Sequence, residues 1–354
     1  MSNSIYNYSR EALEQYFINK KLQKFRATQV FEALYRQKNS SFESINNINK
    51  DVKKLLSEDF AFNSIKEVKR QESNDGTVKF LFELEDGNLI ETVLMVHPYG
   101  YSVCVTSQVG CNMGCSFCAS GVLKKIRNLE VSEMVLEVLM VDNYLNKIGK
   151  KVSHVVIMGI GEPFDNYDNV IEFIKIINDA KGLEIGSRHI TLSTCGLCPK
   201  IKEFSDFPLQ VNLAISLHFP NDTLRSKYMP VNKKYNLSEL IESIKYYYDK
   251  TNRRVTFEYI LLDNINDSND CAKELVSLLK GLNAYVNLIP YNSTGNMFKR
   301  TAETKRDAFF DYLNKNGINA IVRKEHGTEI DAACGQLRVK TIQDNKIKTK
   351  LTKK

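Results

Sequence analysis

The stretch SVCVTSQVGCNMGCSFCASG, residues 102–121, combines two patterns that decide the fold. Its first five residues, SVCVT, are rich in β-branched side chains and predict a buried strand. The cysteines that follow, Cys111, Cys115 and Cys118, stand among glycines, which are poor helix formers. We therefore predict a strand that runs into a cysteine-rich loop.

The chain beyond this stretch repeats the strand and adds helices. Short β-branched runs occupy 102–106, 154–158, 189–193, 211–217, 255–262, 285–289 and 319–323. Amphipathic stretches lie between them, near 131–147, 169–178, 199–206, 237–250, 269–282 and 304–316. Six strand-helix units and a closing strand predict an α/β fold with a parallel sheet, either doubly wound or curled into a partial barrel.

The first hundred residues follow other patterns. Apolar residues recur at helical spacing in 27–34 and again in 52–56, which predicts a small helical region. Alternating residues in 78–84 and 89–95, with Asp86-Gly87 between them, predict a β-hairpin. Because 97–100, HPYG, breaks the pattern, we expect an accessory domain at 1–96, a core at 97–330 and a C-terminal segment at 331–354.

Composition narrows the class of protein. The 354 residues are 43% hydrophobic and contain no apolar run of the roughly 18 residues that a membrane span needs. The first residues lack the pattern of a signal peptide, so we expect a cytoplasmic protein without a membrane partner. In that reducing compartment the eight cysteines favour metal binding or catalysis over disulfides. The net charge of +7 is compatible with nucleic-acid binding without establishing it.

The cysteine cluster allows three interpretations. Spacings of four and three residues would also suit a helix that buries three small apolar side chains. Structural zinc needs four ligands, and no further C-x-x-C or histidine pair lies nearby. A cubane iron–sulfur cluster also takes four ligands, one per iron, so three thiolates leave one iron open. The pattern C-x-x-x-C-x-x-C in a strand-to-helix loop is the signature of radical S-adenosylmethionine (SAM) enzymes.

Polar residues collect where the predicted strands end. Gly161 and Glu162 follow the second strand, Ser193 ends the third, and the fourth runs into Ser216, Leu217 and His218; Asn292 follows the sixth. In a βα barrel the chemistry gathers at these carboxyl ends. Each residue alone suits a turn or a cap, and their shared position is what suggests a cofactor site.

Taken together, these motifs resemble one family, the radical SAM rRNA adenine C2 methyltransferases. These dual-specificity enzymes methylate adenosine 2503 of 23S rRNA and adenosine 37 of some tRNAs. The similarity runs over nearly the whole chain, through KFRATQVFEALY (24–35), ETVLM (91–95), CVTSQVGCNMGCSFCASG (104–121), MGIGEPFDN (158–166), LSTCG (192–196), ISLHFPND (215–222), NLIPYN (287–292) and DAACGQL (331–337).

The resemblance implies a role for each matching residue. Cys111, Cys115 and Cys118 would hold a [4Fe-4S] cluster. The SAM-lining residues would be Gly161, Glu162, Ser193, Ser216, Leu217, His218 and Asn292. Cys334 would be the cysteine that is methylated, Cys104 the resolving cysteine that forms a transient disulfide with it, and Glu91 the base. Two SAM molecules would be used per turnover, and an electron donor such as flavodoxin or ferredoxin would be required.

Alternatives remain at this stage. Cys104 also suits a strand core, and Glu91 lies in a hairpin strand where an exposed glutamate is common. Cys195, Cys198 and Cys271 have no role in the scheme, so we interpret them as structural. Methylation of C8 of the same rRNA adenosine, or a non-catalytic metal-dependent RNA-binding module, are the alternative functions. The resemblance implies 23S rRNA and tRNA as partners, with lysines of the helical region as an extra RNA contact, and we expect a monomer.

Overall fold

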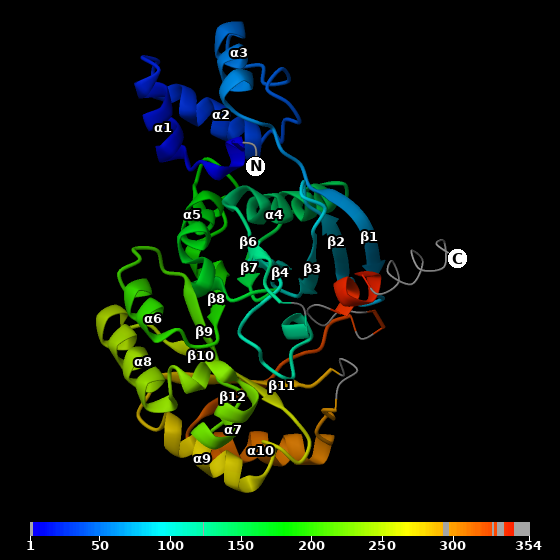
Figure 1. Cartoon of the computed structure of the whole chain (residues 1–354), viewed down its shortest axis with the longest axis vertical. Helices are drawn as coiled ribbons and strands as arrows, with labels where there is room; N and C mark the ends of the chain where they lie inside the picture. The colour runs from blue at the N-terminus through cyan, green and yellow to red at the C-terminus, as the bar shows by residue number, and fades with distance from the viewer. Residues whose placement is uncertain (1–2, 123, 293–296, 328, 331–335, 343–354) are drawn as a thin grey trace.

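A computed structural model describes residues 3–342, apart from residues 123, 293–296, 328 and 331–335 (Figure 1). Its centre is one ten-stranded sheet with the order β1-β2-β3-β4-β7-β8-β9-β10-β11-β12. From β4 onwards neighbouring strands are parallel and follow one another in chain order. A doubly wound sheet reverses its strand order at a switch point, so this order identifies a partial barrel of six βα units and a closing strand.

The strands of this barrel fall close to the predicted ranges. They are β4 (Gly100–Cys104), β7 (His154–Ile157), β8 (Ile190–Thr194), β9 (Asn212–Ser216), β10 (Val255–Leu261), β11 (Ala284–Pro290) and β12 (Asn319–Val322). Many of their apolar residues, such as Val155, Leu192 and Phe257, are completely buried, whereas Ile321 of the edge strand β12 is 43% exposed. Short runs rich in β-branched and apolar residues mark each strand in the sequence, which is why the strands were predictable.

The helices of the six units lie outside the barrel (Figure 1). They are α4 (Val131–Asn146), α5 (Tyr167–Asn178), α6 (Cys198–Phe204), α8 (Leu237–Thr251), α9 (Asn269–Leu279) and α10 (Glu303–Lys315). The sequence pattern did not predict α7 (Asp222–Tyr228), because two turns of helix are too short to show a period.

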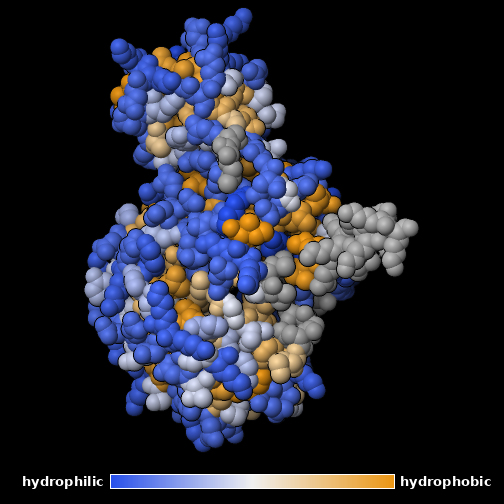
Figure 2. All heavy atoms as spheres, viewed as in Figure 1, coloured by the Kyte–Doolittle hydropathy of each residue, from blue (hydrophilic) through white to orange (hydrophobic). Residues whose placement is uncertain are grey.

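A helical lobe stands above the barrel (Figure 2), and α4 and α5 lie directly beneath it (Figure 1). It contains η1 (Ile5–Asn7), α1 (Arg10–Asn19), α2 (Phe25–Tyr35) and α3 (Lys50–Asp59). Polar contacts dock it: Arg10 Nε pairs with Asp179 Oδ2 at 2.9 Å, and Asn7 Oδ1 accepts from the backbone of Ser132 at 2.8 Å. The small helical region is confirmed, although α1 was not among the predicted helices.

Three antiparallel strands extend the barrel sheet on one side: β1 (Lys66–Glu72), β2 (Val78–Glu83) and β3 (Leu89–His97). The β2–β3 hairpin was predicted, whereas β1, with the sequence KEVKRQE, is a charged and mostly exposed edge strand without an apolar pattern. Because β3 also pairs with β4, with Val93 opposite Cys104, the sheet continues across residue 97. The domain division at that residue stays a prediction.

A C-terminal strap, residues 323–327, runs from the barrel to the antiparallel strands. At one end Arg323 N donates to Leu288 O of β11 at 2.8 Å. Further along, Gly327 N donates to Asp75 Oδ2 in the β1–β2 turn at 3.0 Å. A helix at 336–342 follows and lies beside β1 and β2, drawn in red in Figure 1.

The smaller elements are β5 (Gln108–Val109), β6 (Arg127–Asn128) and the short 3₁₀ turns η2 (Ala119–Val122), η3 (Pro163–Asn166), η4 (Ser187–His189) and η5 (Pro230–Lys233). None of the helices in the described ranges is both long and apolar enough to cross a membrane.

Candidate active site

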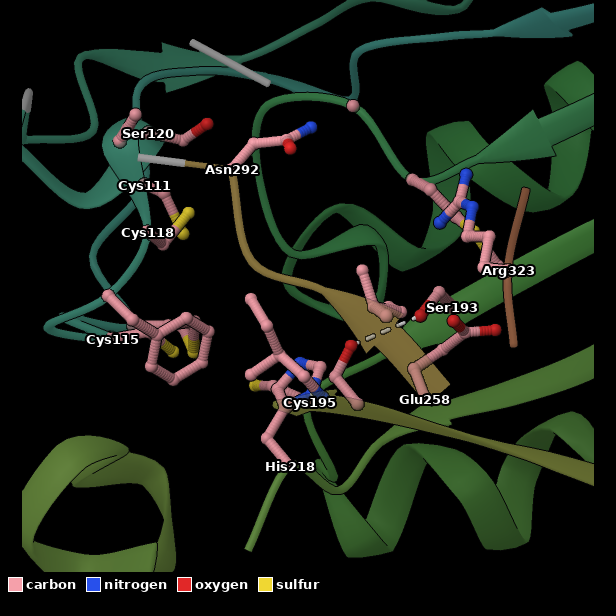
Figure 3. A pocket seen from close by; sticks show the side chains of 18 of the residues that line it. Cys111, Cys115, Cys118, Ser120, Ser193, Cys195, His218, Glu258, Asn292 and Arg323 are labelled. Atoms are coloured by element: carbon pink, nitrogen blue, oxygen red, sulfur yellow. Dashed lines mark hydrogen bonds between the residues drawn. The ribbon is translucent and has the colours of Figure 1, made fainter. Parts of the chain in front are cut away.

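A cavity of about 350 Å³ opens at the carboxyl ends of the parallel strands, with the cysteine loop as one wall (Figure 3). The loops after β7, β8, β9 and β11 form the other walls. Nine of the residues expected at the site line it together: Cys111, Cys115, Cys118, Gly161, Glu162, Ser193, Ser216, His218 and Asn292. Figure 3 shows the three cysteines on one side, facing Asn292, Ser193 and His218 across the cavity.

The cysteine segment is a loop, so the alternative of a helix with three buried cysteines is wrong. Gly114 has a φ of +67°, a conformation that side chains with a Cβ rarely adopt. At Gly121 a Cβ would come within 3.1 Å of Cys115 O, so a larger residue would press on the loop. The loop is anchored by Ser116 N, which donates to the carbonyl oxygen of Tyr228, the last residue of α7, at 3.0 Å.

The three cysteine sulfurs of this loop suit a cubane iron–sulfur cluster better than a single metal ion. Within the described ranges no three Cys, His, Asp or Glu side chains are placed to share one ion. In a cubane each thiolate binds a different iron, so the three sulfurs do not converge on one point. Burial raises the pKa of the Cys111 thiol to about 11 and raises that of Cys115 further. A bound metal removes such thiol protons outright, and the cluster would supply the positive charge that offsets burial.

Glu162 ties two of the cavity loops together. One carboxylate oxygen accepts from Cys195 N at 2.7 Å and the other from Phe164 N at 3.0 Å. The carboxyl is 3% exposed, and burial raises its pKa despite these hydrogen bonds. Its neighbour Gly161 has a φ of +117°, and a Cβ there would lie 2.7 Å from Ser107 Oγ and Gln108 Cβ. This glycine therefore allows two protein loops to pack closely, a role that the sequence did not indicate.

The opposite wall offers hydroxyl and imidazole groups. Ser193 Oγ and Ser216 Oγ lie 3.3 Å apart, from adjacent strands β8 and β9 (Figure 3). His218 Nδ1 accepts from Ile260 N at 3.2 Å, so the ring proton is assigned to Nε2. Burial, with the nearby Arg225 cation, lowers the pKa of His218 to about 3, so the ring is a neutral donor. The Leu217 side chain is fully buried in the core and does not line the cavity.

Glu91 is buried, contrary to the exposed position common for a hairpin glutamate. It is 4% exposed on β3, and its Oε2 lies 2.9 Å from the Nζ of Lys79, a lysine on β2 that is fully buried. Its Oε1 accepts from Arg338 N, in the C-terminal helix, at 2.6 Å. Sequence reasoning missed Lys79, although a lysine within the otherwise apolar run VKFLF was a signal.

Cys104 lies on β4 beside the cavity wall. It is 8% exposed and packs with Val93 and Met95, two β3 residues that line the cavity. Side chains two residues apart share one face of a strand, so Glu91 lies on the face of Val93 and Met95. No disulfide joins any two of the seven cysteines that the structure describes. Cys334 lies outside the described residues.

Other cavity residues were not predicted. Glu258 of β10 and Arg323 of the strap both line the cavity (Figure 3). Cys195, interpreted as structural, lines it too and is 6% exposed. Glu258 stands in the strand pattern VTFEYILL, where a charged residue within an apolar run was the available signal.

Comparison with known proteins gives the family. Residues 105–275 match the model of the radical SAM superfamily, and residues 3–61 match that of the ribosomal RNA large subunit methyltransferase N-terminal domain. Two relatives, each named "Probable dual-specificity RNA methyltransferase RlmN", are each 54% identical in sequence to this chain. The one from Spiroplasma citri is aligned over 95% of this chain and 97% of its own, and the one from Enterococcus faecalis over 98% of both. The chain belongs to the RlmN family of radical SAM RNA methyltransferases.

A solved structure supports the same assignment. The crystal structure of a radical SAM methyltransferase from Sphaerobacter thermophilus matches with a TM-score of 0.90 and 40% identity, over 94% of this chain and 98% of that one. Members of the RlmN family are enzymes that methylate RNA, so the alternative of a non-catalytic RNA-binding module is wrong. Membership of the radical SAM superfamily implies a [4Fe-4S] cluster and SAM as the cofactors of this RlmN-family chain.

Proposed function

We propose that this enzyme methylates C2 of adenosine 2503 in 23S rRNA and of adenosine 37 in tRNA. The names of its relatives support a dual RNA specificity. The main structural support for methylation of a carbon atom is the buried Glu91 carboxylate. Lys79 and Arg338 hold it on the strand face that also borders the cavity. Ordinary methyl transfer needs no buried base beside a cysteine-lined cavity, whereas removal of a proton from an aromatic carbon does.

The proposed roles of the cavity residues follow from their position. Cys111, Cys115 and Cys118 would hold the [4Fe-4S] cluster, and Gly161, Glu162, Ser193, Ser216, His218 and Asn292 would border SAM. Leu217, whose side chain is buried in the core, would contribute its backbone alone. When bound, cluster and SAM supply the reductive cleavage that makes a hydrogen-abstracting group. The Ser193 and Ser216 hydroxyls and the neutral His218 suit the polar groups of such a cofactor, since each of them can donate a hydrogen bond.

Three other residues would handle the methyl group and the base. Cys334 would carry the methyl group that becomes attached to C2, Glu91 would accept the proton that C2 loses, and the Cys104 thiolate would attack the Cys334 sulfur to release the product. Four residues span at most about 14 Å, so the hydrogen bond between Arg338 and Glu91 supports a site for Cys334 near the base. The resulting disulfide would be transient.

The proposal also includes the cofactor use, the redox partner and the cellular location of the enzyme. Each turnover would use two SAM molecules and an electron from a flavodoxin or ferredoxin. The protein would act as a monomer in the cytoplasm, where rRNA and tRNA are found. Methylation of C8 of the same adenosine is the alternative reaction at this site.

Mass spectrometry of the modified nucleoside tests the reaction. The enzyme is expressed in a strain that lacks the native methylase, and rRNA fragments and tRNA are digested and compared with 2- and 8-methyladenosine standards. We expect 2-methyladenosine in both RNAs, and none with Cys118→Ala, which removes one cluster ligand. Detection of the C8 isomer alone would overturn the proposed carbon, and methylated rRNA without methylated tRNA would overturn the dual specificity.

A further inference from the structure

The amino-terminal end of the barrel contains a second cavity, of about 1100 Å³. Side chains from successive strands line it, and five of them are small and polar: Ser102, Thr191, Asn212, Thr256 and Asn287. Apolar side chains such as Met95, Val156 and Ile321 complete the lining. Closed βα barrels fill this space with layers of bulky branched residues, whereas the lumen of this barrel is left open, with a mixed polar and apolar lining.

Positive charge surrounds the opening of this lumen. The cationic rim consists of Arg188, Arg253, Arg254, Arg323 and Lys324. None of the ion pairs within the described part of the chain involves these five residues. Arg188 Nε donates to the neutral Gln210 at 2.7 Å, and the Arg254 guanidinium lies 4.8 Å from the Tyr285 ring centroid. The charge of Arg323 acts on the Glu258 carboxylate deeper in the cavity, and the excess of cations at the mouth attracts anions into it.

A row of aromatic rings runs along the same opening. His326 contacts His97 with centroids 4.7 Å apart, and His97 stacks on Tyr99 at 4.7 Å. Tyr99, which is 66% exposed, then contacts His154 at 5.1 Å. Cations that follow a backbone, together with rings on which bases stack, are the combination that binds single-stranded nucleic acid.

The inner end of the lumen meets the active site. Glu258 lines both cavities, is 5% exposed, and accepts from Asn287 Nδ2 at 2.9 Å. Asn287 Oδ1 is buried, and no donor reaches it in the ranges that the structure describes. The Glu258 carboxylate and the Asn287 carbonyl are acceptors that suit the amino group of a base, and Arg323 and Lys324, which also line both cavities, add donors for a phosphate.

We propose that the cationic rim and the lumen behind it bind a single-stranded segment of the substrate RNA at the amino-terminal end of the barrel. This inference rests on the proposed function and adds the surface that holds the RNA backbone. A volume of about 1100 Å³ exceeds the usual range for small-molecule sites, about 300–1000 Å³, and suits more than one nucleotide. An acidic protein would need an accessible convex surface, whereas these cations surround a hollow.

Fluorescence anisotropy of a labelled RNA stem-loop with an unpaired adenosine in its loop tests the proposal. The probe is titrated with the full chain at several salt concentrations. Arg253→Gln/Arg254→Gln should weaken binding roughly tenfold and lower the salt slope by about 1.4, because each phosphate contact to a single strand contributes about 0.7. Tyr99→Ala should weaken binding without changing the slope, since stacking releases no ions.

The matched control is Lys245→Gln/Lys273→Gln, which removes two positive charges from the outer helices α8 and α9. It should bind like the wild type, and Arg253→Lys/Arg254→Lys should regain most of the lost affinity. If the wild type binds RNA and the Arg253→Gln/Arg254→Gln variant binds with the same affinity and slope, the lumen proposal is wrong while the proposed function stands. Lack of RNA binding by the wild type would overturn both.

Reductive SAM cleavage by the same variants completes the test. With dithionite as reductant, Arg253→Gln/Arg254→Gln should cleave SAM at the wild-type rate, because Arg253 and Arg254 precede β10 and do not line the active-site cavity. If that variant keeps its RNA affinity but is reduced more slowly by an acidic flavodoxin, the rim is a docking site for a redox protein and the RNA proposal is overturned.

Discussion

At the residue scale, Cys104 shows that the surroundings of a residue in a strand depend on the residues of the neighbouring strand. In the sequence it is one apolar residue in SVCVT, and core filling was an alternative interpretation. In the structure it is opposite Val93 on β3, at the end of β4 where the cavity begins. Its neighbours Val93 and Met95 line the cavity, so the structure places this thiol beside the cavity wall, which the strand pattern alone could not indicate.

Exchange of Cys104 and Cys334 for alanine should give opposite results. Cys104→Ala should accumulate protein with covalently attached RNA, because the thioether between Cys334 and the base cannot be cleaved. The adduct should disappear with nuclease but survive heat and thiol on a denaturing gel. Cys334→Ala and the double variant should carry no RNA, since no methyl donor forms.

Cys271→Ala is the control for loss of a buried thiol, since Cys271 lies on α9 and is 7% exposed. It should be free of RNA and active. Lost packing alone would give a poorly folded Cys104→Ala without adduct, so circular dichroism is measured on each variant. A well-folded Cys104→Ala that carries no RNA would refute the resolving role.

At the scale of elements, the strap links the open edge of the barrel to the β1–β2 turn. Asp75 is its anchor: the carboxylate accepts from Gly327 N at 3.0 Å and from Thr77 N at 2.9 Å. Burial raises the pKa of Asp75, but these hydrogen bonds outweigh it and lower the pKa to about 2. The anchor is therefore ionised under all physiological conditions and holds the chain that leads to the Cys334 region.

Removal of this anchor should loosen the strap without unfolding the barrel. We expect Asp75→Ala to raise amide exchange at residues 324–327 and to lower the methylation rate roughly tenfold, because misplaced reacting groups cost rate steeply. Asp86→Ala is the matched control: Asp86 fills the equivalent turn position in the next hairpin, where it binds Asn88 and Arg127. Amide hydrogen exchange of both variants is measured by mass spectrometry, and the iron content of each variant checks that it is folded. Equal exchange of the strap in the two variants would contradict an anchoring role for Asp75.

At the scale of the whole molecule, the histidines connect distant parts of the fold. His326 of the strap, His97 of β3, His154 of β7 and His189 of η4 form one row together with Tyr99. Burial, followed by the charges of His326, His154, Arg323 and Lys324, lowers the pKa of His97 to about 4. The pKa values of His154 and His326 are also lowered, first of all by burial.

These shifts predict acid sensitivity. An unfolded histidine takes up a proton near pH 6.5, whereas folded His97 resists it until about pH 4, so the unfolded state binds more protons in that window. The free energy of unfolding should therefore fall as the pH drops from about 6.5 towards 4. His97→Phe, which keeps a ring in the row, should lose less stability over this range in urea titrations than the wild type. Tyr99→Phe removes no histidine and should show the full wild-type loss; an identical pH profile for His97→Phe would contradict the assignment.

The sequence by itself determined the barrel units, the cysteine loop and the set of strand-end residues. Each of these rests on local patterns: continuous apolar runs, helical periodicity, and cysteines among glycines. The six predicted helices begin within two residues of their observed positions for that reason. Short or charged elements, such as α7 and β1, have no such pattern and were missed.

Only the tertiary structure decided which residues share an environment. Glu91 is 12 residues from Lys79 and 247 from Arg338, yet both bind its carboxylate. The strap joins Gly327 to Asp75 across 252 residues, and the rim of the lumen collects cations from three separate segments. Pairing of β2 with β3 brings Lys79 to Glu91, whereas Arg338, Gly327 and the rim cations reach their places only when burial of the apolar core curls the sheet. Local propensity carries no information on these long-range contacts.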